Sequence, residues 1–86
     1  MTIYVSNLDP NVIDSDLRKL FAPFGEVLSA EVKRDKYNGR SRCAALVEMP
    51  VAKNGRQAIC CLDNITLLGK KIQVTELHDH LKLMNF

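Results

Sequence analysis

The segment Arg42-Cys43-Ala44-Ala45-Leu46-Val47-Glu48-Met49 alternates in the period of two that a β-strand imposes on its side chains. One set of alternate residues is entirely apolar and suits a protein core: Ala45, Val47 and Met49. The opposite set combines a cation, a small residue, a leucine and an acid: Arg42, Ala44, Leu46 and Glu48. We therefore predict a strand with one buried face, and we expect any binding surface of the sheet to lie on the other face.

The sequence on either side of this strand predicts the element order β-α-β-β-α-β. The other strands are expected over residues 2–6, 27–34 and 71–75, and the helices over residues 14–22 and from 51 or 52 to 62. Asp14 is the preferred N-cap of the first helix, with a start one residue earlier as the alternative. The irregular spacing of inward residues in the second strand indicates a bulge, and Asn38-Gly39 marks the hairpin turn that follows. This order predicts an α+β, ferredoxin-like sandwich, in which two helices cover one face of a four-stranded antiparallel sheet and leave the other open.

The composition is that of one soluble, folded domain. The chain has 86 residues, of which 47% are hydrophobic and 26% are charged, and this argues against disorder. No apolar run is long enough to span a bilayer, and the first residues lack a basic region followed by an apolar one. The three cysteines are odd in number and lack metal-ligand spacing, which favours buried free thiols in a reducing compartment. We expect a cytoplasmic protein with no membrane partner.

Catalytic and metal-binding signatures are not recognisable in the sequence. It contains no nucleophile–base pair, no glycine loop that could cradle a phosphate and no cluster with metal-ligand spacing. His78 and His80 are two ligands at most, too few for a tetrahedral site, and are interpreted as solvated. The sequence therefore predicts no enzyme activity, cofactor or metal.

Positive charge is concentrated in one segment of a chain whose net charge is only +2. Five cations against a single acid, Asp35, lie between residues 33 and 42: Lys33, Arg34, Lys36, Arg40 and Arg42. This asymmetry is typical of a contact with a polyanion, although a solvated loop would carry the same charges. Tyr37 lies within the segment and is a candidate to stack on a nucleotide.

Two segments resemble the signature of the RNA recognition motif family. Ile3-Tyr4-Val5-Ser6-Asn7-Leu8 is similar to the family's first-strand hexamer, and residues 42–49 lie where its third-strand octamer belongs. Supporting similarity comes from the Phe24-Gly25-Glu26-Val27 run and from Leu68-Gly69-Lys70-Lys71-Ile72-Gln73-Val74. The resemblance covers residues 2–76 and is greatest to small single-domain bacterial members. It implies an RNA recognition motif domain over residues 1–76, followed by a tail over residues 77–86.

The resemblance implies that the open sheet face binds single-stranded RNA by stacking bases on aromatic side chains. Tyr4 holds the hexamer's stacking position, but Ala44 and Leu46 occupy the octamer's two aromatic positions, and Cys43 occupies its glycine position. Each stacked base contributes about 1–3 kcal/mol, so this degenerate octamer predicts weaker binding. The residues expected to contact RNA are Tyr4, Asn7, Lys33, Arg34, Lys36, Tyr37, Arg40, Arg42, Ala44, Leu46, Gln73 and Thr75. Asn7 is equally suited to fixing the turn after the first strand.

A protein-interaction module of the same fold is the alternative. The Ala44 and Leu46 surface is apolar, and Leu77, Leu81 and Met84 recur at helical spacing in the tail. The tail could form a short amphipathic helix or a mobile end. In this alternative the sheet face is covered by the tail or by a second copy of the chain, giving a homodimer, or it binds a protein partner.

Overall fold

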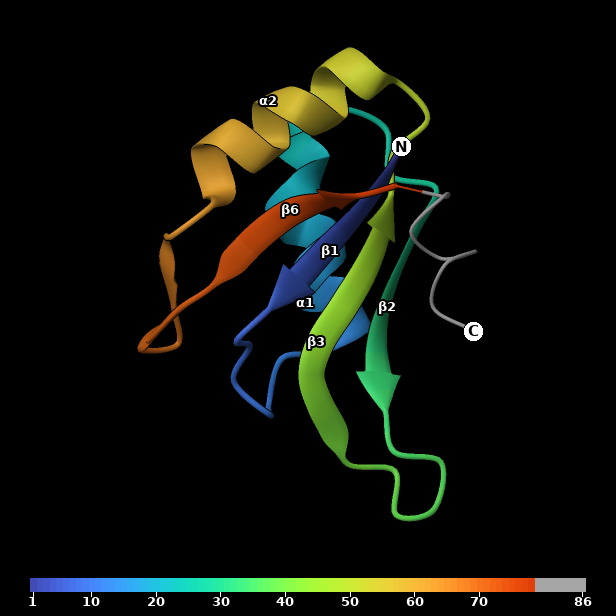
Figure 1. The fold of residues 1–86 in the computed structure, drawn as a ribbon, viewed down its shortest axis with the longest axis vertical. Coiled ribbons are helices and arrows are strands. Elements are labelled where there is room, and N and C mark those ends of the chain that lie inside the picture. The colour runs from blue at the N-terminus through green and yellow to red at the C-terminus, as the bar shows by residue number, and fades with distance from the viewer. Residues whose placement is uncertain (79–86) are drawn as a thin grey trace.

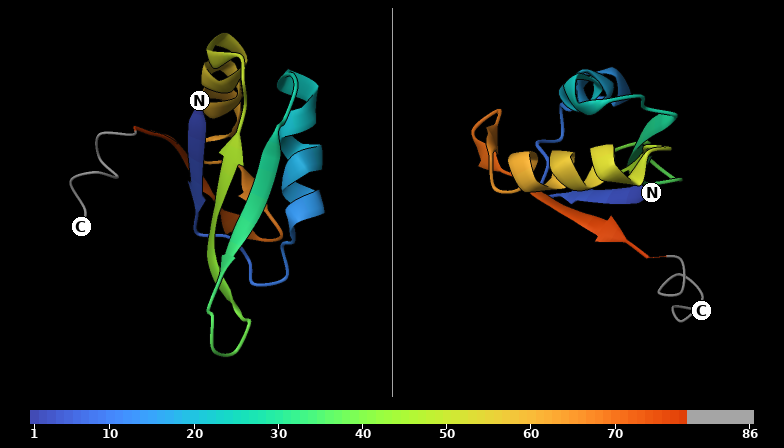
Figure 2. Two further views of the ribbon diagram at one scale, coloured as in Figure 1. Left: turned by 90° about the vertical axis from the view of Figure 1, so that its right-hand side faces the viewer. Right: turned by 90° about the horizontal axis from the view of Figure 1, so that it is seen from above.

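The computed structural model describes residues 1–78 and arranges them in two layers (Figure 1). The elements are β1 (Thr2–Ser6), α1 (Asp14–Phe21), a short 3₁₀ turn (Ala22–Phe24), β2 (Ser29–Arg34), β3 (Ser41–Glu48), α2 (Ala52–Leu62), β4 (Thr66–Leu67), β5 (Lys70–Lys71) and β6 (Gln73–Leu77). Four strands form an antiparallel sheet in the order β2-β3-β1-β6. Both helices lie on the same side of this sheet (Figure 2). The predicted α+β ferredoxin-like fold is confirmed.

The core lies between the sheet and the helices. Strands β1 and β3 contribute the alternate residues that the period of two assigned to the interior, and these are completely buried: Ile3, Val5, Ala45 and Val47. Leu17 and Phe21 of α1, together with Ala58 and Leu62 of α2, pack against them. The face opposite the helices therefore carries the other alternate set, including Tyr4 and Leu46.

The start of α1 differs from the preferred prediction. Ile13 is the N-cap residue, and its backbone N–H donates to the Asp16 carboxylate at 3.0 Å. The Asp14 carboxylate instead accepts the backbone N–H of Val32, on edge strand β2, at 2.8 Å. The prediction of Asp14 as N-cap is thus wrong, and the alternative start one residue earlier, with a poor cap, is right. The reason is that the Asp14 carboxylate binds an N–H of strand β2 and not one of its own helix.

Strand β2 begins at Ser29, two residues later than predicted. The backbone N–H of Leu28 still donates to the Glu48 carbonyl at 2.8 Å, so the preceding residues approach the sheet without joining its regular ladder. The predicted irregularity exists, but the register shift lies between Val32 and Arg34, opposite residues 41–45 of β3.

The segment after α2 forms a small hairpin, β4–β5, that the sequence did not predict. As a result, the last strand of the main sheet covers residues 73–77 instead of 71–75, and Leu77 belongs to the sheet and not to the tail. Of the predicted tail, residues 79–86 lie outside the described residues, among them His80, Leu81 and Met84.

The cysteines are unpaired, as predicted for Cys43, Cys60 and Cys61, but they are not all buried. Cys60 and Cys61 are exposed on α2, because the buried side of that helix is formed by Gly55, Ala58 and Leu62. Cys43 is partly buried against the core. No helix within residues 1–78 is long and apolar enough to cross a membrane.

Asp63 accepts a backbone N–H at the β6 edge of the sheet, as Asp14 does at the β2 edge. Its carboxylate accepts the backbone N–H of Val74 on β6 at 2.9 Å. An edge strand otherwise leaves such groups unpaired, which favours association with other chains. At each edge of the sheet, an aspartate carboxylate from the helix layer therefore accepts a hydrogen bond from one of the N–H groups that point away from the sheet.

Replacing Asp63 with alanine is expected to lower the free energy of unfolding by about 1 kcal/mol, because the part-buried Val74 N–H loses its acceptor. Thermal unfolding followed by circular dichroism should show a melting temperature lower by about 4–8 °C. Asp63→Asn, which keeps a side-chain oxygen, is the matched control and should recover most of the loss. An unchanged melting temperature in Asp63→Ala would contradict this role.

Candidate nucleic-acid interface

Tyr4 lies at the centre of the open sheet face. In the strand register it is directly opposite Leu46 of β3 on one side and Thr75 of β6 on the other, and Glu31 of β2 is opposite Leu46. Side chains directly opposite one another in an antiparallel pair share a face and lie about 4.5–5.5 Å apart at Cβ. Tyr4 is 37% exposed. The row therefore presents one accessible aromatic ring between an aliphatic side chain and a hydroxyl group.

The neighbouring row toward the β2–β3 loop contains small and polar residues. Ser6 is opposite Ala44 on β3 and Gln73 on β6. Ala44 is almost completely buried, so it offers a ligand very little surface, whereas Gln73 is exposed. Of Ala44 and Leu46, the two positions that the sequence resemblance assigns to aromatic side chains, only Leu46 has appreciable exposed surface.

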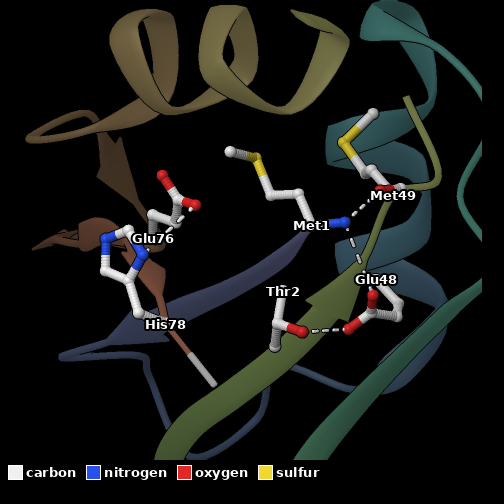
Figure 3. Close-up of polar contacts among 6 residues, drawn as sticks. All are labelled: Met1, Thr2, Glu48, Met49, Glu76 and His78. Atoms are coloured by element: carbon white, nitrogen blue, oxygen red, sulfur yellow. Dashed lines mark hydrogen bonds and ion pairs between the residues drawn. The ribbon is translucent and has the colours of Figure 1, made fainter. Parts of the chain in front are cut away.

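The row on the far side of Tyr4 holds the acid Glu48 opposite Thr2. The Glu48 carboxylate accepts a hydrogen bond from the Thr2 hydroxyl and lies 3.6 Å from the Met1 ammonium, which also donates to the Met49 carbonyl at 2.8 Å (Figure 3). At the same end of the sheet, His78 Nδ1 is 3.6 Å from Glu76 Oε2. The negative charge of Glu48 is thus partly neutralised within the fold.

The second acid of the open face, Glu31, is also paired. Its carboxylate lies 3.2 Å from Lys33 Nζ, two residues along the same strand. Glu31 is largely and Lys33 partly solvent-exposed, so this ion pair contributes little to stability and is easily replaced by another partner. A phosphate group approaching Lys33 would compete with Glu31 for the ammonium.

The β2–β3 loop is organised by Asp35. Its carboxylate accepts the backbone N–H groups of Tyr37 at 2.8 Å and Asn38 at 3.2 Å, and its own N–H donates to the Arg40 carbonyl at 2.8 Å. The hydrogen bond from Tyr37, then that from Asn38, and the nearby Arg42 guanidinium lower the pKa of the Asp35 carboxyl. Of the predicted turn residues Asn38 and Gly39, only Gly39 takes the left-handed conformation, with φ 72°.

The β2–β3 loop extends beyond the end of the sheet, and cations lie in it and at the strand ends that it joins (Figure 1). Arg34, Lys36, Arg40 and Arg42 are all exposed. Arg42 Nη2 lies 3.8 Å from Asp35 Oδ2, and Lys36 Nζ lies 5.2 Å from the centre of the Tyr37 ring. Tyr37 itself is 86% exposed. The fold therefore gathers these cations and one tyrosine at the end of the face nearest Ala44 and Gln73.

A pH titration tests the role of Asp35. Its pKa is lower in the folded loop than the ordinary value of 3.8, so the loop contacts stabilise the fold above that value and are lost as the pH falls through the lowered pKa. The amide NMR signals of Tyr37 and Asn38 should therefore titrate with a midpoint below 3.8. In Asp35→Asn these signals should lose the transition. A midpoint at or above the ordinary value would exclude the proposed cause.

Asn7 and Cys43 have structural roles at the loop end of β1 and β3. Asn7 is left-handed, with φ 60°, and its side-chain amide donates to the Lys71 carbonyl at 2.8 Å, so it fixes the turn after β1. Cys43 is also left-handed, with φ 61°, and its carbonyl accepts the backbone N–H of Leu8 at 2.9 Å. Sequence reasoning did not predict this conformation, although the family's glycine at the Cys43 position was the available signal.

Comparison with known proteins is consistent with this geometry. The family model described as RNA recognition motif matches residues 3–73. The chain belongs to the RNA recognition motif family. This makes it an RNA recognition motif domain, homologous to RNA-binding proteins.

Similar proteins include both short and long chains. The putative RNA-binding protein RbpD of Nostoc is 37% identical over 76 residues, which is 88% of this chain and 81% of that protein. The RNA-binding protein RRM4 of Mycosarcoma maydis is 39% identical over 77 residues, but the chain spans only 10% of its length. The crystal structure of the RNA-binding protein PG1 superimposes with a TM-score of 0.89 at 39% identity, covering 92% of this chain and 95% of that one.

Proposed function

We propose that the open sheet face of this domain binds single-stranded RNA, with Tyr4 as its one stacking platform. The observation that carries the proposal is the position of Tyr4, exposed at the centre of the face and flanked by Leu46 and Thr75. Any base has a π-face that can stack on such a ring, so the contact itself has little sequence preference. Leu46 adds an aliphatic contact to the base or ribose.

The exposed cations favour phosphate contacts at the loop end of the face. Arg34, Lys36, Arg40 and Arg42 are exposed at the loop end and are positioned to contact phosphates. Gln73 and Thr75, at the β6 edge, can hydrogen-bond base edges. Tyr37 offers a second ring within the loop, and Asn7, Lys33 and Ala44 contribute less, because their surface or charge is already engaged. With the octamer aromatics replaced, we expect weak binding of short RNA with modest base preference.

An NMR titration with a mixture of random RNA hexamers tests this proposal. Amide shifts should be confined to the open sheet face and its loop, that is, to Tyr4, Leu46, Arg42, the β6 edge at Gln73 and Thr75, and the β2–β3 loop. The affinity should fall with salt, with a slope of about −0.7 for each phosphate contacted. A double-stranded RNA of the same composition is the control and should bind more weakly. Shifts restricted to the helix layer, or an affinity independent of salt, would refute binding on the sheet face.

A protein-interaction role of the same face is the second candidate, favoured by one observation. Leu77 of β6 lies opposite Thr2 of β1, in the row next to that of Tyr4 and Leu46. Strand β6 therefore ends at the edge of the open face, and residues 79–86 follow it in the sequence. Those residues include Leu81 and Met84 and are long enough to cross the sheet, or to engage a second copy of the chain.

Light scattering of the full chain and of a form ending at His78 separates the two candidates. A dimer that is lost on truncation, or RNA binding that strengthens on truncation, supports an occupied face. A monomer in both cases, with unchanged RNA binding, excludes it. The cytoplasmic location and the small bacterial type are also proposals, supported by the unpaired cysteines and by the length of the cyanobacterial relative.

A further inference from the structure

A second concave surface lies in the helix layer, between α1 and the β4–β5 hairpin. It has a volume of about 370 Å³, and we call it the hairpin groove. Its lining residues come from these two elements and from the segment just before α1: Val12, Asp16, Lys19, Leu20, Leu67 and Leu68. Within the described chain, this lining contains none of the residues assigned to RNA. The groove is therefore a separate surface whose occupant the RNA proposal does not explain.

Leu68 is unusual in both its exposure and its backbone. It is 61% exposed and has φ 51°, and the next residue, Gly69, has φ 81°. A two-residue hairpin turn in which both φ values are positive is most often formed by Asn-Gly. The left-handed region is unfavourable for leucine. An asparagine at position 68 would suit the turn better and would remove an apolar side chain from water. The leucine thus has a conformational cost with no compensating burial in the fold, which is the kind of outlier that indicates function.

The size of the hairpin groove favours a short occupant. Four apolar side chains line the groove. They are too few to bury the 1,200–2,000 Å² or so of total surface that a stable protein–protein interface buries. Its volume is near the lower end of the range of about 300–1,000 Å³ for ligand pockets. One or two large apolar side chains of a peptide would fill it, whereas a second copy of the whole domain would not be held by it alone.

The rim of the hairpin groove favours an acidic peptide. Lys19 lines the groove, and Lys70 is paired with Leu67 in the hairpin and so projects from the same side as that leucine. The acid of the lining, Asp16, already accepts the N–H of Ile13 through its carboxylate. Asp16 keeps its negative charge in this hydrogen bond, so the two cations against one acid give the rim a net charge of +1.

We propose that the hairpin groove docks a short peptide segment carrying one or two large apolar side chains flanked by carboxylates. The apolar side chains lie between Leu20, Leu67 and Leu68, and the carboxylates pair with Lys19 and Lys70. The domain then acts as an adaptor that holds an RNA on its sheet face and a protein segment on its helix layer. Docking of the peptide stands independently of RNA binding, whereas the adaptor role also rests on the proposed function of the sheet face.

Three synthetic peptides test the proposal against the full chain: Glu-Asp-Glu-Leu-Phe-Glu-Asp-Glu, its variant with Ala-Ala in place of Leu-Phe, and its variant with Lys and Arg in place of the acids. Fluorescence polarisation should show that the first binds about tenfold or more tightly than either of the others, since it alone supplies both apolar burial and complementary charge. Amide NMR shifts should fall on α1 and the hairpin.

The variant L68N separates docking from folding, because asparagine suits the turn. It should keep or raise the melting temperature and weaken the acidic peptide about tenfold. K19E should weaken the same peptide and improve the basic one, and Y4A should change neither. The proposal is overturned if the first two peptides bind equally, if L68N binds like the parent chain, or if RNA hexamers rather than the peptide shift the groove residues.

Discussion

Tyr4→Ala is expected to weaken the binding of single-stranded RNA hexamers about tenfold or more. An aromatic side chain that stacks on a base contributes about 1–3 kcal/mol, and 1.4 kcal/mol corresponds to a factor of ten in affinity. Tyr4 provides the accessible ring at the centre of the face, with Leu46 and Thr75 as its neighbours. Removing it leaves aliphatic and hydroxyl groups, which offer no stacking surface.

Tyr4→Phe is the matched control, because it keeps the ring and removes only the hydroxyl. We expect it to retain most of the affinity, and we expect neither variant to change the fold, since the side chain projects from the face opposite the core. Isothermal titration calorimetry at a fixed salt concentration measures the affinities, and circular dichroism checks the fold. If Tyr4→Ala binds like the parent chain, or if Tyr4→Phe loses as much as Tyr4→Ala, then stacking on this ring is not the source of binding.

The alternation of apolar and polar residues was sufficient to predict which side chains reach the open face. Residues 3 and 5 are buried and Tyr4 is exposed, as the period of two requires. The neighbours of Tyr4 depend on register instead, and Thr75 lies 71 positions away in the chain. Local sequence does not encode that pairing, so only the family resemblance placed these residues on one face before the structure gave their register.

The wrong predictions have a common cause in contacts between distant segments. Asp14 has the chemistry of an N-cap, but the N–H of Val32, 18 residues away, occupies its carboxylate. The β4–β5 hairpin was missed because Leu68 takes a conformation that leucine seldom adopts, so the usual turn signal is absent. Cys43 is left-handed for a comparable reason, in a strand where the irregular register requires it. In each case an intrinsic preference is overridden by the packing of the rest of the fold.

Electrostatics distinguishes the two ends of the open face. Glu48 is held by Thr2 and by the Met1 ammonium at one end, whereas the loop cations at the other end face mainly solvent. Exposed cations contribute most to the binding free energy of a phosphate. Their contact releases counterions from the RNA and breaks few contacts within the protein. RNA affinity should therefore come from two separate sources, the aromatic platform and the loop, and each can be altered alone.

Leu46→Phe is expected to strengthen RNA binding about tenfold. The change restores an aromatic side chain at one of the two octamer positions where the family stacks bases, directly opposite Tyr4 in the register. A second ring beside the first can stack a second base, for about 1–3 kcal/mol. Leu46 is only partly buried and projects from the open face, so the larger side chain does not need space in the core.

Leu28→Phe is the control for added aromatic surface. Leu28 is 56% exposed and lies before β2, outside the central row, so the same substitution there should leave RNA affinity unchanged. The double variant with Tyr4→Ala gives a further test: if the two rings hold neighbouring bases of one strand, Leu46→Phe should recover part of the affinity that Tyr4→Ala removes. Equal gains from Leu28→Phe and Leu46→Phe would mean that aromatic surface anywhere increases binding, and no gain from Leu46→Phe would mean that the bound strand does not cross β3.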